Sequence, residues 1–252
     1  MNFKRKGWRR DSLDHRDRRL SLARAQAPLP SRVDLSPRFP AVHDQLNCNS
    51  CVGNAVADLS QFVTGKPQGP SRLMIYYGAR KLEGDPAADN GCEIRNGIKS
   101  LSRWAACTEA DWPYDVSRVS LSPNANAYNH AAAIGDYAKL YFRLDQTLDQ
   151  LRSMLAEGSP FVFGFSVFES FESDAVAASG VMPMPVPNEG ITGGHAVAAV
   201  GYDDDQRMFI VRNSWGAGWG RSGYFLMPYA FIENPDYCDD FWVIKSIGRG
   251  AP

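Results

Sequence analysis

A cysteine, a histidine and an asparagine each lie in a sequence context that suits acyl transfer. Cys51 begins the segment 51–62, whose apolar residues recur at the spacing of one helical face, so it lies near a predicted helix start. The N-terminus of a helix stabilises a thiolate, which is the nucleophilic form of cysteine. His195 follows two glycines at the start of a predicted strand, and Asn213 follows another predicted strand. These residue types provide a nucleophile, a general base and an amide that orients the base.

Gln45 extends this set, because acyl transfer passes through a tetrahedral intermediate that carries a negatively charged oxygen. The side-chain N–H of Gln45 and the backbone N–H of Cys51 are expected to donate to that oxygen. The plain structural alternatives are a core histidine at 195, an asparagine that satisfies a turn at 213 and a solvated glutamine at 45. The remaining histidines lie in polar stretches without a strand or an asparagine partner, and they are His15, His43 and His130.

The elements expected to position these residues change in type along the chain. Helices are predicted at 51–62, 71–81, 96–106 and 148–157. From residue 161 onward, short apolar and β-branched runs predict strands. We expect an α+β fold in which a helical half, about 41–135, meets a β-rich, barrel-like half, about 136–252, in a cleft that holds the active site. The predicted strands are 161–168, 195–202, 208–212, 224–227 and 241–244.

The composition is that of an ordinary globular protein. Of the 252 residues, 44% are hydrophobic and 22% are charged, and the longest apolar runs are too short to span a bilayer. A net charge of -1 gives no reason to expect nucleic acid or an anionic membrane as a partner. We expect no metal and no cofactor, because no residue cluster has metal-ligand spacing and the glycines of 216–220 lie beside tryptophan rather than in a phosphate-binding loop.

Three segments resemble the papain family of cysteine peptidases, and the resemblance runs from about residue 28 over most of the chain. Residues 45–52 are similar to the family's Gln-x-x-Cys-Gly-Ser-Cys-Trp, residues 195–197 to its His-Ala-Val and residues 213–220 to its Asn-Ser-Trp-Gly-x-x-Trp-Gly. The resemblance implies a papain-like fold and a cysteine endopeptidase that cleaves peptides through a thiolate-imidazolium pair and an acyl-enzyme. It also implies that Trp215 shields the contact between His195 and Asn213 from water.

The chain departs from the family beside the nucleophile and in the region of the substrate pocket. Asn49 replaces the usual glycine and Val52 the usual tryptophan, and Cys92 is followed by Glu-Ile-Arg instead of a glycine pair that binds substrate backbone. By resemblance, glycines lie around the second specificity pocket where larger residues are usual, with an aspartate near its base. We therefore expect a roomy pocket that tolerates basic side chains. The pocket residues are Gly164, Gly193, Gly194 and either Asp239 or Asp240.

Residues 1–27 form a basic arm that precedes the predicted peptidase domain, residues 28–252. The arm resembles the short leader of bacterial papain-like peptidases, and no apolar stretch follows its basic residues as it would in a signal peptide. We expect it to lie in the cleft and inhibit the enzyme, as in a zymogen, with Trp8 or Leu13 as anchors. The alternatives are a disordered tail or a site where the arginines bind a nucleotide or another polyanion.

The five cysteines leave at least one thiol free. The resemblance places Cys92 in the region of the partner cysteine, and a bridge from Cys48 to Cys92 is worth roughly 4 kcal/mol in the chain-entropy model. Such a bridge favours an oxidising, secreted or periplasmic location. All-buried thiols are the alternative, and Cys107 and Cys238 have no assigned role.

Two other functions fit the same residues. A papain-like acyltransferase or transpeptidase uses the same catalytic set but passes the acyl group to an amine. A catalytically silent papain-fold protein only binds, although an intact set of Cys51, His195, Asn213 and Gln45 argues against that interpretation.

Overall fold

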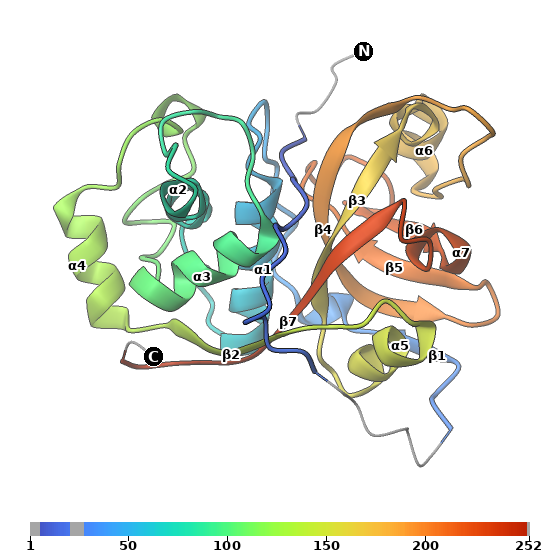
Figure 1. Ribbon diagram of the computed structural model, residues 1–252, viewed down its shortest axis with the longest axis horizontal. Coiled ribbons are helices and arrows are strands. Elements are labelled where there is room, and N and C mark those ends of the chain that lie inside the picture. The colour runs from blue at the N-terminus through green and yellow to red at the C-terminus, as the bar shows by residue number, and fades with distance from the viewer. Residues whose placement is uncertain (1–5, 21–27, 251–252) are drawn as a thin grey trace.

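The structure is a computed structural model that describes residues 6–20 and 28–250. The helices of residues 51–134 gather on one side, and a curved antiparallel sheet with the three shorter helices of residues 148–232 lies on the other (Figure 1), which confirms the predicted α+β class. The helices are α1 (Cys51–Thr64), α2 (Arg72–Leu82), α3 (Ile94–Trp104), α4 (Ala125–Ile134), α5 (Leu148–Ala156), α6 (Asp174–Ser179) and α7 (Tyr229–Ile232). The strands are β1 (Arg32–Asp34), β2 (Tyr137–Arg143), β3 (Phe161–Phe168), β4 (Ile191–Asp203), β5 (Met208–Arg212), β6 (Tyr224–Pro228) and β7 (Cys238–Gly248).

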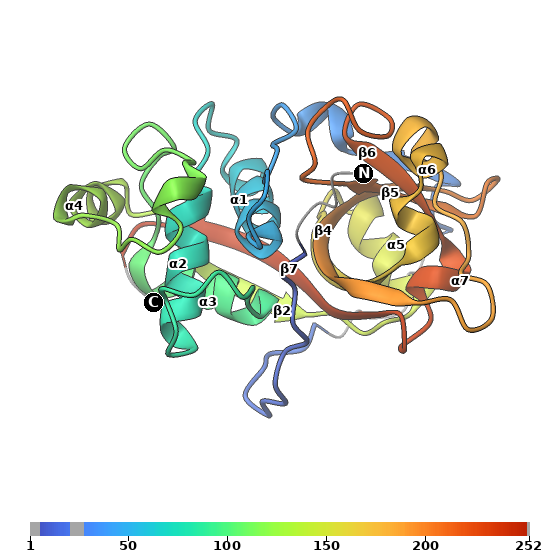
Figure 2. The same cartoon turned by 90° about the horizontal axis from the view of Figure 1, so that it is seen from above.

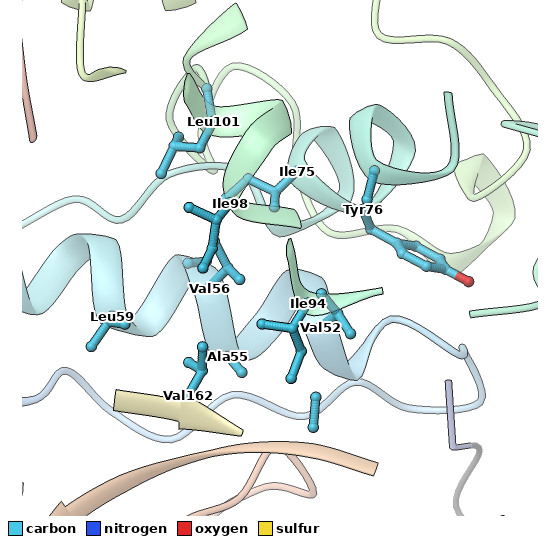
Figure 3. Packing of buried hydrophobic residues seen from close by; sticks show 14 of the residues in the cluster. Val52, Ala55, Val56, Leu59, Ile75, Tyr76, Ile94, Ile98, Leu101 and Val162 are labelled. Atoms are coloured by element: carbon cyan, nitrogen blue, oxygen red, sulfur yellow. The ribbon is translucent and has the colours of Figure 1, made fainter. Parts of the chain in front are cut away.

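Helix α1 carries the predicted nucleophile and lies at the centre of the molecule. Every residue from Cys51 to Phe62 is buried, because α2 and α3 cover one side of the helix and the sheet covers the other. Figure 3 shows Val52 and Val56 close to Ile94 and Ile98 of α3. Gly97 allows this approach, since a Cβ atom there would lie 2.8 Å from a methyl group of Val52. A helix packed on all sides holds its first residue in a fixed place.

The sheet has the strand order β2-β7-β3-β4-β5-β6, with β1 added beside β4. It curls strongly (Figure 2), but among the described strands β2 and β6 do not pair, so the hydrogen-bonded sheet stays open. The register places Gly164 of β3 opposite both Ala196 of β4 and Asp239 of β7. Residues predicted for the substrate pocket therefore come from three neighbouring strands.

The sequence patterns missed two elements between the halves. Helix α4 buries only Ala127 and Ala131, and a helix with so narrow an apolar stripe lacks the periodicity on which the prediction depended. Strand β2 pairs with β7 across two irregularities in register, which break the alternation of a regular strand. No helix in the described part of the chain is long and apolar enough to cross a membrane.

Candidate active site

The thiol of Cys51 lies at the first residue of α1 and is fully buried. The backbone N–H of Gly7 donates to its sulfur over 3.3 Å, and the backbone N–H of Ala196 on β4 also lowers the thiol pKa. Burial outweighs these donors and raises the pKa of Cys51 to about 11. The predicted nucleophile therefore lies next to the strand that carries His195, and with residues 6–20 in place it is a neutral thiol.

His195 is held by Asn213 and by aromatic rings. Its Nε2 lies 2.7 Å from Oδ1 of Asn213, and its ring stacks on Trp215 with centroids 4.9 Å apart. Trp215 is itself 5% exposed, so it covers the imidazole from solvent. Nδ1 is buried and has no hydrogen-bond partner among the described residues. Burial lowers the pKa of His195 to about 4, and the charge of Lys6 acts in the same direction.

Gln45 joins the loop before α1 to the loop after β5. Its Nε2 donates to the carbonyl oxygen of Cys48 over 2.8 Å, while the hydroxyl of Ser214 donates to its Oε1 over 2.7 Å. Its backbone N–H also donates to the carbonyl of Ser214. Because Gln45 is completely buried and held at both ends of its amide, the orientation of that amide is fixed. The sequence offered no sign of the role of Ser214.

A buried ion pair braces the loop that carries Asn213. Arg212, at the end of β5, contacts both carboxylate oxygens of Asp58 on α1, at 2.7 and 3.1 Å. The same guanidinium donates to the backbone carbonyls of Pro40 and Ala41. Sequence reasoning missed this pair, although an arginine at the end of an apolar strand is itself a signal, because a buried charge needs a partner.

The described part of the basic arm runs between the two halves (Figure 1). Its backbone pairs with both sides: Trp8 N–H donates to the carbonyl of Gly194, and the carbonyl of Gly7 accepts from the N–H of Cys92. Charged side chains of the arm form ion pairs with oppositely charged groups of the domain. These are Lys6 with Glu172, Arg9 with Glu83, Arg10 with Asp239, Asp17 with Arg95 and Arg19 with Asp145.

Trp8 fills the region that the sequence indicated as a substrate pocket. Its ring lies against Gly164 and Gly194, and its Nε1 donates to Oδ2 of Asp240 over 3.0 Å. Trp8 is buried, whereas Leu13 is 87% exposed. Leu13 was therefore wrong as an anchor, since an exposed side chain contributes little apolar burial.

The base of this pocket holds a cluster of charges that the sequence did not reveal. The side chain of Asp11, on the arm, is buried beside Asp240, and Arg143 of β2 contacts both carboxylates, at 3.3 and 2.8 Å. The indole N–H of Trp242 also donates to Asp11 over 2.7 Å. These residues are far apart in sequence, and only the pairing of β2 with β7 and the docking of the arm bring them together.

The predicted disulfide between Cys48 and Cys92 is wrong. All five cysteines are buried free thiols, and the side chain of Cys48 faces the carboxylate of Asp89 at 3.7 Å. The backbone of Cys92 pairs with the arm, while Cys107 and Cys238 are buried without a bridge. The four cysteines other than Cys51 behave as small apolar core residues. The expectation of a secreted or periplasmic location rested on the bridge and has no support from the structure.

Comparisons with known proteins agree with this geometry. The model of the papain family cysteine proteases matches residues 29–235. An uncharacterized peptidase C1-like protein of Acanthamoeba polyphaga mimivirus is 40% identical over 215 residues, which are 81% of this chain and 69% of the viral protein. Cysteine proteinase 3 of Entamoeba histolytica is 25% identical over 79% of this chain, and the chain spans 62% of that protein.

Among solved structures, the chain is similar to xylellain, a cysteine protease from Xylella fastidiosa. The two are 39% identical, with a TM-score of 0.90, over 98% of this chain and 99% of that chain. The family model covers well over half of the chain, and the similarity extends to the described part of the arm. This protein belongs to the papain family of cysteine proteases.

Proposed function

We propose that the protein is an endopeptidase in which Cys51 is the nucleophile, His195 the acid-base group, Asn213 the orienting amide and Gln45 an oxyanion donor. The observation that carries this proposal is the position of His195. Its Nε2 lies 2.7 Å from Oδ1 of Asn213, and the backbone N–H of the next residue, Ala196, lies close to the Cys51 thiol. With Nε2 occupied, Nδ1 is the imidazole nitrogen left for proton transfer with the thiol.

The reaction then follows from the roles of these groups. Transfer of the Cys51 proton to His195 gives a thiolate, which attacks the carbonyl carbon of the substrate and places negative charge on its oxygen. Gln45 and the Cys51 backbone N–H donate to that oxygen. The imidazolium gives its proton to the leaving amine, and an acyl-enzyme remains. His195 then takes a proton from water, which attacks the thioester, and the acid product leaves as the thiol is restored.

We propose further that the arm of residues 1–27 inhibits this reaction. Gly7 contacts the sulfur of Cys51 directly, so the reacting carbonyl of a substrate cannot occupy that place. The burial that raises the pKa of Cys51 and lowers that of His195 also disfavours the ion pair on which reactivity depends. Several arginines of the arm already contact domain carboxylates, which favours an inhibitory role over binding of a nucleotide or other polyanion. The boundary at residue 27 stays a prediction because 21–27 lie outside the described residues.

The proposal is tested by labelling with an epoxide thiol inhibitor such as E-64, together with hydrolysis of fluorogenic peptides. We expect one label per molecule after displacement of the arm, lost in Cys51→Ala but retained in Cys238→Ala, whose thiol is also buried. Absence of labelling and of hydrolysis contradicts the proposal and favours a protein that only binds. Acyl transfer to an added amine faster than hydrolysis favours the acyltransferase.

Ser214→Ala is expected to lower kcat about tenfold with KM nearly unchanged. The variant removes the hydroxyl that donates to Oε1 of Gln45 and loosens the amide that receives the oxyanion, at a cost of about one hydrogen bond. Steady-state kinetics with a fluorogenic peptide measure the effect. Ser117→Ala, which removes an exposed serine hydroxyl, is the matched control. A fall in KM and kcat together, or an effect as small as that of the control, contradicts the role of Ser214 in positioning Gln45.

Docking of the arm is expected to weaken as the pH rises from about 4 to 7. Burial and the neighbouring Asp240 raise the pKa of docked Asp11 from 3.8 to about 7, so docking takes up a proton. The raised pKa of Asp11 favours docking fully below pH 3.8, the pKa of the free carboxyl. This benefit is lost as the pH rises through about 7, the pKa of the docked carboxyl. The groups that face Asp11 are Asp240, Trp242 and Arg143, with the backbone of Arg95.

The measurement is the inhibition constant of a peptide of residues 1–20 against processed enzyme at pH 5 and pH 8. We expect the inhibition constant to rise at least about tenfold between the two, because each unit of pH below the raised pKa is worth up to a factor of ten. The same peptide with Asp11→Asn, which carries no titrating group at this position, should show a clearly smaller rise, because only the titration of groups in the enzyme then remains. Equal slopes for both peptides contradict the assignment to Asp11.

A further inference from the structure

We propose that the pocket occupied by Trp8 selects substrates that present an indole, a flat neutral ring with an N–H donor, with Gly164 and Asp240 as the residues that determine this specificity. The inference rests on the proposed peptidase function and names its substrate class. It concerns the pocket itself, whether the arm or a substrate fills it.

The walls of the pocket match a flat ring. A Cβ atom at Gly164 would lie 1.9 Å from Cε2 of Trp8, and one at Gly194 would lie 2.8 Å from Cε3. Both distances are far inside van der Waals contact, so the ring rests directly on the backbone of β3 and β4. Trp8 is 6% exposed as a result, which removes nearly the whole indole from water.

The base of the pocket requires a donor and already contains a cation. Asp240 is completely buried; its Oδ1 accepts from Arg143 at 2.8 Å, while its Oδ2 accepts the indole N–H of Trp8 at 3.0 Å. Arg143 also contacts Asp239 at 2.6 Å, but the side chain of Asp239 is 35% exposed, so the buried carboxylate that Arg143 neutralises is that of Asp240. A neutral N–H then satisfies the remaining oxygen of Asp240, whereas a lysine or arginine of a substrate would bring a second cation close to Arg143. A phenylalanine would leave the buried oxygen without this donor.

The pocket adjoins the nucleophile. Gly7, the neighbour of Trp8, has its N–H 3.3 Å from the Cys51 sulfur, and Trp8 donates its own backbone N–H to the residue before His195. Asp240 also has a φ of 58°, in the left-handed region that is unfavourable for most side chains. A strained backbone at the base of a pocket is typical of a functional site.

The experiment uses protein from which residues 1 to 26 have been cut away after folding, at a protease site inserted within 21–27, which empties the pocket, and fluorogenic peptides that differ only at the second residue before the cleaved bond. We expect kcat/KM for tryptophan to exceed that for leucine and for arginine at least about tenfold, the ratio of a single well-matched buried contact. Adding Gly164→Ala should lower the tryptophan rate much more than the leucine rate. Adding Asp240→Asn should bring the ratio of tryptophan to phenylalanine close to one, because the single amide oxygen is taken by Arg143.

Each outcome decides the proposal. Thermal melting and E-64 labelling of every variant show that it is folded and that Cys51 reacts. If Cys51 is labelled, three results overturn the inference and leave the peptidase proposal intact. These are a higher kcat/KM for arginine than for tryptophan, equal kcat/KM values for all the peptides, and equal losses for tryptophan and leucine in Gly164→Ala. An enzyme that is neither labelled nor able to cleave any of the peptides overturns the peptidase proposal and the inference with it.

Discussion

Removal of the arm is expected to raise the reactivity of Cys51 at pH 7 about a hundredfold. Burial holds the pKa of the covered thiol at about 11, so roughly one thiol in 10⁴ is ionised at pH 7. An uncovered thiol at a helix N-terminus beside a histidine has a pKa of about 7 or below. The fraction of Cys51 that is thiolate then rises by about 10⁴. A thiolate whose pKa is about four units lower is intrinsically less nucleophilic by about 10², so the net gain in reactivity is about a hundredfold.

The measurement is the pH profile of alkylation by iodoacetamide and of peptide hydrolysis, before and after removal of residues 1 to 26. A protease site inserted within 21–27 allows the full chain to fold before the arm is cut away. We expect the alkylation profile to move from strongly alkaline pH to near neutral pH. Cys238→Ala is the matched control for other buried thiols. An unchanged profile and an unchanged initial rate contradict autoinhibition.

Asp58→Asn is expected to lower the free energy of unfolding by about 3–5 kcal/mol, because it leaves the guanidinium of Arg212 buried without its carboxylate. Arg212 is 1% exposed and Asp58 2% exposed, so water cannot replace the lost contact. Burial by itself raises the pKa of Asp58, yet Arg212 and His43 hold it below its usual value, which shows how strongly the charged form is favoured. The loss corresponds to a melting temperature roughly 10 °C lower for a chain of this size.

Chemical denaturation at neutral pH measures the change. The control is Glu157→Gln, which removes one partner of the more exposed pair with Lys245 and should cost at most about 1 kcal/mol. Because Arg212 adjoins Asn213 and binds the segment before Gln45, activity at low temperature should fall in Asp58→Asn as well. A variant as stable as the control contradicts the buried ion pair.

The sequence by itself determined the family and the class of fold, and it predicted the chemistry. The residue types around Cys51, His195 and Asn213, and the change from helical to alternating periodicity near residue 161, are local signals. Such signals follow from backbone geometry and from the type of side chain, so they can be read without knowing what lies nearby. Helix α4 escaped because its alanines carry almost no periodic contrast.

Only the tertiary structure decided the state of those residues. The free thiols of Cys48 and Cys92, the indole of Trp8 against Gly164 and the pairing of Asp58 with Arg212 all depend on groups distant in sequence. Burial and charge pairing are properties of a packed neighbourhood, and they alter pKa values and pocket shape without any local pattern in the chain. The sequence therefore predicts the catalytic groups, whereas the structure shows that Cys51 is buried, with Gly7 of the arm against its sulfur.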